Sequence, residues 1–436
     1  MNPIAKELNE IIQKENIHVY EMLSEIGKNL FFPKGILSQS AEAKIKADKI
    51  NATIGVAKEK NNVMFLDSVI DEIPNIPPEK ALTYAPSFGI PDLRNAWKKE
   101  EYEKNPSLKE KSISLPVVTN GITHALSTFA DIWTDKGDLI ILPDLFWGNY
   151  NLIMKVRKGL EFAHYETFNS EGGFNVSGFD ECVKEHAKNR KKIIVILNYP
   201  HNPSGYSITD SEASSIVKTL EDVASSGTNV IAVSDDAYFG LFFEEDTCKE
   251  SVFAKIAGIH EKILAIKLDG ATKENFVWGL RCGFITYGTK TISNESQFYE
   301  ALEKKTAGCI RGNISNASHL GQSIILKSMN SENYHKQKQQ KFQILKERAN
   351  KVKEVVYNSK YADFFTPYPF NSGYFMCIKL KKNVDAEKLR LHLLDNYGVG
   401  LISIDSNNLR VAFSSINLED VEPLFDAVYN GINDLL

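Results

Sequence analysis

The sequence predicts an α/β fold: a large domain whose mostly parallel sheet lies between two layers of helices, with a smaller α+β domain beside it. Short apolar runs rich in Ile and Val recur through the middle of the chain, at residues 137–144, 191–200, 229–238 and 261–270. Such runs are typical of parallel strands with both faces covered. Helix-like segments such as 210–224 separate them, and this alternation indicates βαβ units.

The pattern changes after a long polar stretch. Residues 327–360 are rich in Lys, Gln and Glu and lack Pro and Gly, which predicts a long connecting helix with a candidate break near Asn333. Strands are then expected at 373–380, 399–404 and 408–416, and helices at 386–398 and 418–436. We therefore expect a large domain of residues 62–326 and a small domain made of residues 1–61 and 327–436.

Composition excludes several classes of protein. The 436 residues are 43% hydrophobic and 25% charged, as in ordinary globular proteins. A net charge of −5 argues against a nucleic-acid partner. No stretch approaches the roughly 18 apolar residues of a membrane helix, and the N-terminus lacks the apolar core of a signal peptide. The five cysteines are scattered without a CxxC pair, so we expect a cytoplasmic protein with no cysteine-based metal site.

Polar residues follow several of the predicted strands. Asn202, Asp235 and Lys273 each come after an apolar run, and Gly121 and Thr123 follow another. Each residue alone could be an ordinary turn or capping residue. Ligands of open parallel sheets, however, bind outside the carboxyl ends of the strands. We therefore expect an amide, a carboxylate, an amine and a glycine turn to meet in one crevice.

The segment TNGITHALSTFADIW (119–133) resembles a glycine turn that opens a helix. The free N–H groups and the dipole of such a helix start form a site for an anion such as phosphate. The segment contains neither GxGxxG nor GxxxxGK[ST], which argues against a dinucleotide or a nucleoside triphosphate.

Lys273 lies in a loop, with Arg281 eight residues later. Such a lysine is commonly a solvated charge, but the neighbouring Trp278 and Phe284 indicate a packed loop. A partly desolvated lysine forms Schiff bases with carbonyl compounds, and a guanidinium offers a forked contact to an anion. A lysine, a carboxylate and a phosphate cradle together are what pyridoxal 5'-phosphate requires.

From about residue 51 to residue 410 the sequence resembles a class I aminotransferase of the pyridoxal-phosphate fold-type I superfamily, closest to the aspartate/aromatic branch. The matching segments are NATIGVAKEKN (51–61), YAPSFGIPDLRNAW (84–97), FWGNY (146–150), HNPSG (201–205), DDAY (235–238), the Lys273–Arg281 spacing and LRVAFS (409–414). The match of seven segments in order is specific, although no single one is.

The resemblance implies a role for each cofactor-binding residue. Lys273 would bind the cofactor's aldehyde and act as the catalytic residue, and Asp235 would contact the ring nitrogen. Asn202 and Tyr238 would bind the ring oxygen, and Trp147 would stack on the ring. The phosphate group would be held by Gly121, Ile122, Thr123, Thr272, Arg281 and, from the neighbouring subunit, Tyr84. The Asn202–Pro203 bond is a candidate cis peptide.

The resemblance also implies how the substrate is held. Arg410 would grip the α-carboxylate, and Asn202, Trp147, Ile54 and Gly55 would border the substrate. Arg311, five residues before Asn316, has the spacing of an arginine that crosses from the partner subunit to a distal carboxylate. The alternative is that Arg311 only forms a salt bridge at the dimer interface. A homodimer with shared active sites follows from the resemblance.

Three features depart from the family pattern. Gly270 stands where a serine is common, so Thr272 would supply the hydroxyl. Ile122 stands in the phosphate loop where a hydroxyl is frequent. Residues 31–50 match no family segment and could cover the site, because they precede the substrate strand.

We therefore expect a transaminase that moves an amino group by a ping-pong mechanism between an amino acid and a 2-oxo acid such as 2-oxoglutarate. Aspartate or glutamate is the expected amino donor, with aromatic amino acids as the alternative. A lyase or decarboxylase with the same cofactor is the second interpretation. A ligand-sensing regulator is the third, and it is disfavoured because no helix-turn-helix precedes residue 51.

Overall fold

The computed structural model describes residues 1–31, 35–291 and 295–436. Within these ranges the main sheet has seven strands in the order β4-β10-β9-β8-β7-β5-β6. Only β10 runs antiparallel to its neighbours, and the other pairs are parallel. The strands are β4 (Val117–Thr119), β5 (Leu139–Pro143), β6 (Glu161–Tyr165), β7 (Lys192–Leu197), β8 (Asn229–Asp235), β9 (Ile263–Gly270) and β10 (Gly283–Gly288).

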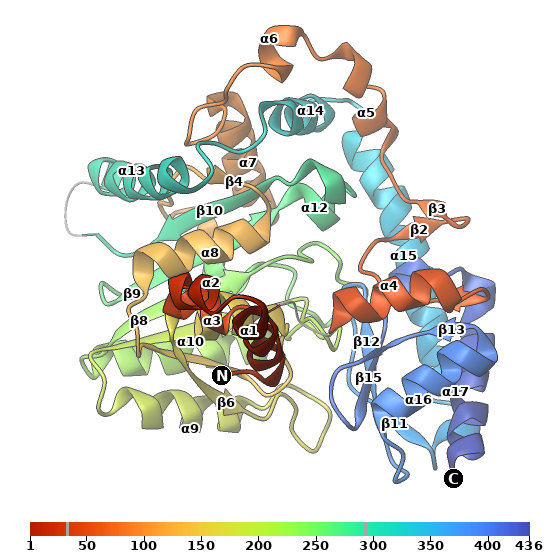
Figure 1. Cartoon of the computed structure of the whole chain (residues 1–436). Coiled ribbons are helices and arrows are strands. Elements are labelled where there is room, and N and C mark those ends of the chain that lie inside the picture. Colours follow the sequence, from red (N-terminus) through yellow and green to blue (C-terminus); the bar gives the residue numbers. More distant parts are fainter. Residues whose placement is uncertain (32–34, 292–294) are drawn as a thin grey trace.

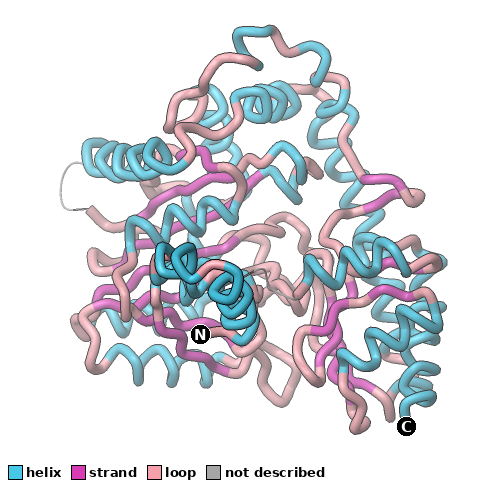
Figure 2. Tube along the Cα trace, viewed as in Figure 1, coloured by secondary structure: helices cyan, strands magenta, loops and turns pink. Residues whose placement is uncertain are grey.

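Apolar side chains alternate between the two faces of this sheet, because successive residues of a strand point to opposite sides. Ile194 and Ile196 of β7 belong to one core with Phe129 of α8, whereas Ile193 and Val195 belong to a second core. The helices concerned are α8 (Ile122–Trp133), α9 (Val176–Ala187), α10 (Asp210–Ser225) and α11 (Val252–Ile256), the last three packing in the second core. The predicted three-layer α/β fold is confirmed (Figures 1 and 2).

A second, antiparallel sheet follows in the C-terminal part, in the order β11-β12-β15-β14. Its strands are β11 (Phe365–Pro367), β12 (Met376–Leu380), β14 (Ile402–Ser403) and β15 (Asn408–Val411), beside α16 (Ala386–His392) and α17 (Val421–Leu435). The helix predicted for 327–360 is interrupted: α14 (His319–Met329) ends before the expected break, and α15 (Tyr334–Val356) follows it. α15 reaches the small sheet unit by packing on α17 (Figure 1).

The N-terminal residues divide between the two sheets. α1 (Pro3–Glu15), α2 (Ile17–Met22) and α3 (Glu25–Asn29) pack together. Residues of α3 border a cavity that is also lined by residues within 146–159 of the large sheet unit and by 402–404 of the small one. α4 (Ile36–Lys46) contacts the small unit, and β1 (Ile50–Asn51) pairs with β13 (Val399–Gly400). Residues 32–34 of the unmatched segment lie outside the described residues. The domain boundaries at residues 61 and 326 stay a prediction.

The remaining elements belong to neither the seven-stranded nor the four-stranded sheet. They are β2 (Lys58–Glu59), β3 (Asn62–Val63), α5 (Asp67–Ile70), α6 (Pro78–Ala81), α7 (Pro91–Lys104), α12 (Ala271–Glu274) and α13 (Glu295–Asn313), with π-helical turns at η3 (Asn151–Val156) and η6 (Leu393–Tyr397). Among the helices of the described ranges, none combines the length and the apolar character needed to span a bilayer.

Candidate active site

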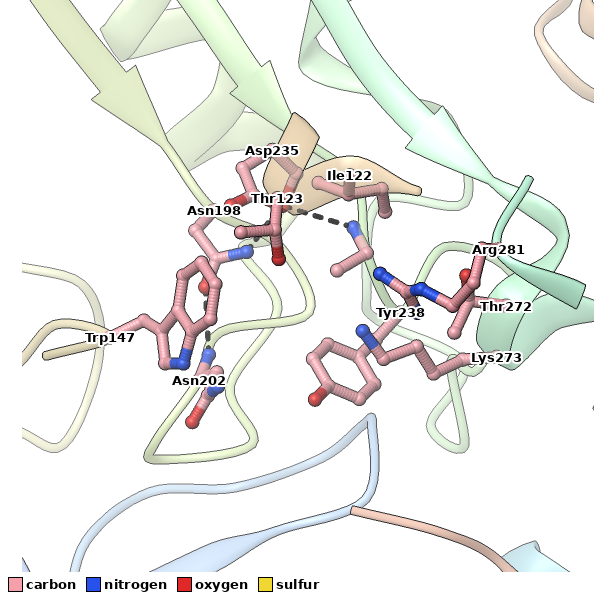
Figure 3. Close-up of a pocket in the computed structure, with 11 residues that line it drawn as sticks. Ile122, Thr123, Trp147, Asn198, Asn202, Asp235, Tyr238, Thr272, Lys273 and Arg281 are labelled. Atoms are coloured by element: carbon pink, nitrogen blue, oxygen red, sulfur yellow. Dashed lines mark hydrogen bonds between the residues drawn. The ribbon is translucent and has the colours of Figure 1, made fainter. Parts of the chain in front are cut away.

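A small pocket of about 120 Å³ opens at the carboxyl ends of the central strands. It is lined by Ile122, Thr123, Trp147, Asn198, Asn202, Asp235, Ala237, Tyr238, Thr272, Lys273 and Arg281. These residues come from the end of β8, from the starts of α8 and α12, and from the loops that follow β5, β7, β8 and η4 (Trp278–Leu280) (Figure 3). The strand-end rule therefore brings together most of the cofactor-binding residues predicted from the sequence.

Lys273 projects into this pocket from α12, directly after β9. Its ammonium nitrogen lies 4.8 Å from the centre of the Tyr238 ring, and Tyr374 donates a hydrogen bond to its backbone oxygen at 3.3 Å. Burial lowers the pKa of Lys273 to about 8, the charge of Arg281 adds to this effect, and Asp235 opposes it. A substantial share of the amine is therefore neutral near physiological pH, which is the form that attacks a carbonyl group or accepts a proton.

Asp235 is the last residue of β8, and its carboxylate is buried in the pocket. The Tyr150 hydroxyl donates to Oδ2 at 2.5 Å, and the Ala237 N–H donates to Oδ1 at 3.3 Å. Burial raises the pKa of Asp235, while the Tyr150 hydrogen bond and Lys273 oppose this rise. Burial and the Asp235 charge also raise the pKa of Tyr150, so the phenol stays a donor.

The start of α8 forms a cradle beside Arg281. Gly121 precedes the helix with a φ of 81°, and a Cβ there would lie 2.4 Å from Nη2 of Arg281. Only glycine therefore fits the backbone conformation and the close approach of the guanidinium. The Thr272 hydroxyl is buried and has no hydrogen-bond partner among the described residues. Helix N–H groups, a guanidinium and an unsatisfied hydroxyl together suit a phosphate group.

Arg410 reaches the edge of the pocket from β15 of the small sheet. It donates to Oδ1 of Asn202 at 3.2 Å and to the Thr53 carbonyl at 3.0 Å, and its guanidinium lies 4.1 Å from the centre of the Phe375 ring. Its Nε is buried and has no partner among the described residues. The Asn202–Pro203 peptide is cis, as predicted. A buried cation with a free donor at this place suits a substrate carboxylate.

Four further predicted site residues do not line this pocket: one pair follows β1, and the other pair is exposed on the surface of the chain. Ile54 and Gly55 follow β1, and a Cβ on Gly55 would contact Phe375 at 3.0 Å and the Tyr238 hydroxyl at 3.6 Å. Tyr84 is 87% exposed. Arg311, near the end of α13, is exposed and donates to the Ser315 hydroxyl at 2.6 Å. A single chain does not bring Tyr84 and Arg311 into its own pocket.

Sequence reasoning missed three residues at this site. Asn198 and Ala237 line the pocket, and Asn198 donates to the Asp235 carbonyl at 2.7 Å while its Oδ1 accepts from the Asn202 N–H at 2.8 Å. Asn198 is a polar residue directly after the apolar run of β7, so the strand-end rule could have found it. Tyr150 was quoted within FWGNY, but no local signal pairs it with a carboxylate 85 residues away.

These residues fit pyridoxal phosphate. The pocket offers a half-buried amine for the aldehyde, a buried carboxylate for the ring nitrogen, an indole for the ring face and a cradle for the phosphate group. In the described part of the chain, no cluster of His, Cys, Asp and Glu could hold a metal ion.

Comparisons with known proteins agree with this geometry. The model of the family "Aminotransferase class I and II" matches residues 47–428. An aspartate aminotransferase of Bacillus sp. (strain YM-2) is 28% identical over 61% of this chain and 63% of the relative. A probable aspartate/prephenate aminotransferase of Aquifex aeolicus is 26% identical over 50% of this chain and 55% of the relative. The matched regions thus span less than two thirds of these relatives.

Solved structures resemble the whole chain. An aminotransferase of Anaerococcus prevotii has a TM-score of 0.83 at 23% identity and covers 94% of this chain and 99% of its own. The cytoplasmic aspartate aminotransferase of Saccharomyces cerevisiae has a TM-score of 0.75 at 19% identity and covers 97% and 100%. A Pyrococcus horikoshii kynurenine aminotransferase, solved in complex with PMP, has a TM-score of 0.78 at 16% identity and covers 96% and 98%.

Together the fold and the pocket define a fold-type I protein whose pocket suits pyridoxal phosphate. The chain belongs to the class I and II aminotransferase family. Both the predicted family and the predicted cofactor, pyridoxal phosphate, are therefore confirmed.

Proposed function

We propose that this protein is an aminotransferase that moves an amino group between an amino acid and a 2-oxo acid by a ping-pong mechanism. The observation that carries the proposal is the half-buried amine of Lys273, which lines one pocket together with Asp235 and Arg281. Pyridoxal phosphate, when bound, supplies the electron sink for the reaction.

The residues of this chain divide the remaining work. Lys273, when it is neutral, would take the proton from the substrate Cα and return it at the cofactor's C4′. Asp235, whose ionised form is favoured by the hydrogen bond from Tyr150, would hold the ring nitrogen of the cofactor. Arg410 holds the α-carboxylate through its forked donors. Trp147, which lines the pocket, would orient the cofactor ring and exclude water from one of its faces.

An absorbance experiment tests this proposal. Purified protein loaded with the cofactor should show a visible band that decreases when an amino acid is added and returns when a 2-oxo acid follows. A lyase or decarboxylase would instead turn over without any oxo acid. Product formation that is independent of 2-oxoglutarate would therefore contradict the proposal.

We further propose that acidic amino acids and 2-oxoglutarate are substrates, with aromatic amino acids as further donors. The names of the curated relatives support this, since several are aspartate aminotransferases. Arg311, exposed in the single chain, is the residue that would pair with a distal carboxylate from the partner subunit. The five cysteines are free thiols, which suits a cytoplasmic location.

Replacing Arg311 with Leu is expected to reduce kcat/KM for aspartate and glutamate by roughly 10²-fold or more. The reason is that loss of a buried charged hydrogen-bond partner costs on the order of 2–5 kcal/mol. Activity toward an uncharged amino acid should change much less. Steady-state kinetics with both kinds of donor measure this difference. Equal losses would mean that Arg311 supports the structure and does not contact the substrate.

We propose that the active sites are shared within a homodimer. Tyr84, 87% exposed in the single chain, would reach the partner subunit's phosphate group. With aspartate as the amino donor, a Lys273→Ala chain mixed with a Tyr84→Phe or Arg311→Leu chain is therefore expected to regain part of the lost activity, because one site of the heterodimer contains no substitution. Light scattering should give the mass of a dimer. A fully active, monodisperse monomer would contradict this proposal.

A further inference from the structure

A group of buried charges lies behind the pocket, on the other face of the sheet. We call Lys267, Glu101, Asp236 and Asp269 the buried charge cluster. The Lys267 ammonium nitrogen is 2.6 Å from Asp269 Oδ2, 3.0 Å from Glu101 Oε1 and 3.4 Å from Asp236 Oδ2. All four side chains are at most 3% exposed. One cation is thus surrounded by three carboxylates in a site that water does not reach.

The strand register connects this cluster to the pocket. Ser234 of β8 lies opposite Lys267 of β9, and Asp235 lies opposite Leu268. Paired residues share a face of the sheet and successive residues alternate, so Asp236 must point to the face opposite Asp235. The backbone N–H of Asp236 also donates to the Leu268 carbonyl at 2.9 Å. At the end of β8, the Asp236 carboxylate therefore points to the buried charge cluster on one face of the sheet, and the Asp235 carboxylate points into the pocket on the other face.

A second set of ion pairs holds the lysine loop in the same way. Glu274 follows Lys273 and pairs with Lys104 of α7 and, at 2.8 Å, with Lys338 of α15. Lys104 also pairs with Glu100, and Glu101 of the buried charge cluster lies between these two residues on α7. Asp235 and Lys273 are thus each followed by an acidic residue that turns away from the pocket into a buried ion pair.

Stability alone does not account for the buried charge cluster. Bringing several charges out of water is costly, and apolar side chains of similar volume often stabilise a protein as well or better. The cost here is visible in the carboxyl groups: burial raises the pKa of Asp236 to about 6, although Lys267 opposes this rise. The indole N–H of Trp97 donates a hydrogen bond to Asp269 Oδ2 at 2.9 Å, which also helps to hold this carboxylate in place.

We propose that Lys267 is a positioning residue that holds the ends of β8 and β9 through Asp236 and Asp269, and so keeps Asp235 and Lys273 at the separation that the reaction requires. This inference rests on the proposed aminotransferase function. The positional precision matters because a misplacement of about 1 Å can cost roughly 10²-fold in rate.

The test compares the Lys267→Met protein with the wild type and with a matched control, Arg94→Met. Arg94 lies on α7, the helix that also carries Glu101; it is buried and pairs with Glu303 at 2.7 Å, but it does not contact the buried charge cluster. Lys267→Met should lower kcat by about 10-fold or more with little change in KM. Arg94→Met should lower the melting temperature and leave kcat near the wild-type value.

Two further measurements separate positioning from simple structural support. The pH midpoint of the visible band of the cofactor-loaded protein should rise by about one unit in Lys267→Met, because removal of a cation favours the protonated form of the cofactor–lysine linkage. The melting temperature of the variant should fall further below that of the wild type at pH 8 than at pH 5. Without Lys267 the folded carboxyl groups bind protons more tightly than the unfolded ones, so stability is lost as the pH rises.

The following results would overturn the inference. If the melting temperature of Lys267→Met falls but its kcat and pH midpoint stay at the wild-type values, Lys267 has only a structural role. That is the result expected for the control variant. If Lys267→Met does not fold, Asp236→Asn replaces it, since it weakens the contact next to Asp235 and conserves the side-chain shape; unchanged kcat and midpoint in that variant would also overturn the inference. A wild-type protein without a visible band would contradict the proposed function itself.

Discussion

The Lys273→Ala protein is expected to fold normally and to lose transamination by several orders of magnitude. Lys273 is half-buried, and the loss of solvation lowers its pKa, so its removal takes away a costly charge and should not destabilise the fold. Activity should collapse because covalent attachment of the cofactor and proton transfer at Cα depend on the same amine. Single-turnover kinetics and a melting curve measure the two effects separately.

Borohydride reduction provides an independent check of Lys273. Reduction of the loaded wild-type protein should fix the cofactor on Lys273, and mass spectrometry of the digest identifies the modified lysine. Lys192→Ala is a suitable control, because Lys192 lies at the amino end of β7, away from the pocket, and pairs with Asp138. Near wild-type turnover by Lys273→Ala, or a label on another lysine, would disprove the assignment.

Replacing Asp235 with Ala is expected to reduce kcat by roughly 10²- to 10³-fold. The reason is that loss of a buried charged hydrogen-bond partner costs on the order of 2–5 kcal/mol. Asp235 faces the pocket and accepts a hydrogen bond from Tyr150, whereas Asp236 faces Lys267 on the other side of the sheet. Asp236→Ala should therefore reduce kcat less than Asp235→Ala does, although it also removes a contact of the buried charge cluster.

The comparison of the two aspartates decides between two registers of β8. Steady-state kinetics give the ranking, and the melting temperature separates a loss of chemistry from a loss of stability. Asp235→Ala should lower kcat more than it lowers the melting temperature. Burial already disfavours the charged form of the Asp235 carboxylate in the wild type, so its removal costs little stability. A larger loss of kcat in Asp236→Ala than in Asp235→Ala would mean that the opposite face of the strand carries the site.

Sequence patterns determined the α/β class and most of the pocket. Buried parallel strands appear as apolar runs because both of their faces are covered, and their polar ends meet because parallel strands share one carboxyl edge. Asn202, Asp235, Lys273 and Arg281 could therefore be assigned to one pocket without coordinates. The spacing from Lys273 to Arg281 and the cradle that begins at Gly121 are local features, encoded in a few neighbouring residues.

Contacts between residues far apart in the chain were decided only by the tertiary structure. Tyr150 and Asp235 form a hydrogen bond although they are 85 residues apart in the chain, and Lys267 and Glu101 pair although they are 166 residues apart. No local sequence pattern predicts either pair. The N-terminal residues were expected to join the small domain, and this assignment stays a prediction: α3 borders a cavity lined by residues of both sheet units, and the packing of an amphipathic helix depends on which apolar surface is near it. The sequence thus determines which side chains a strand end offers, whereas the register of β8 on β9 and the docking of α7 decide which charges face the pocket and which are buried behind it.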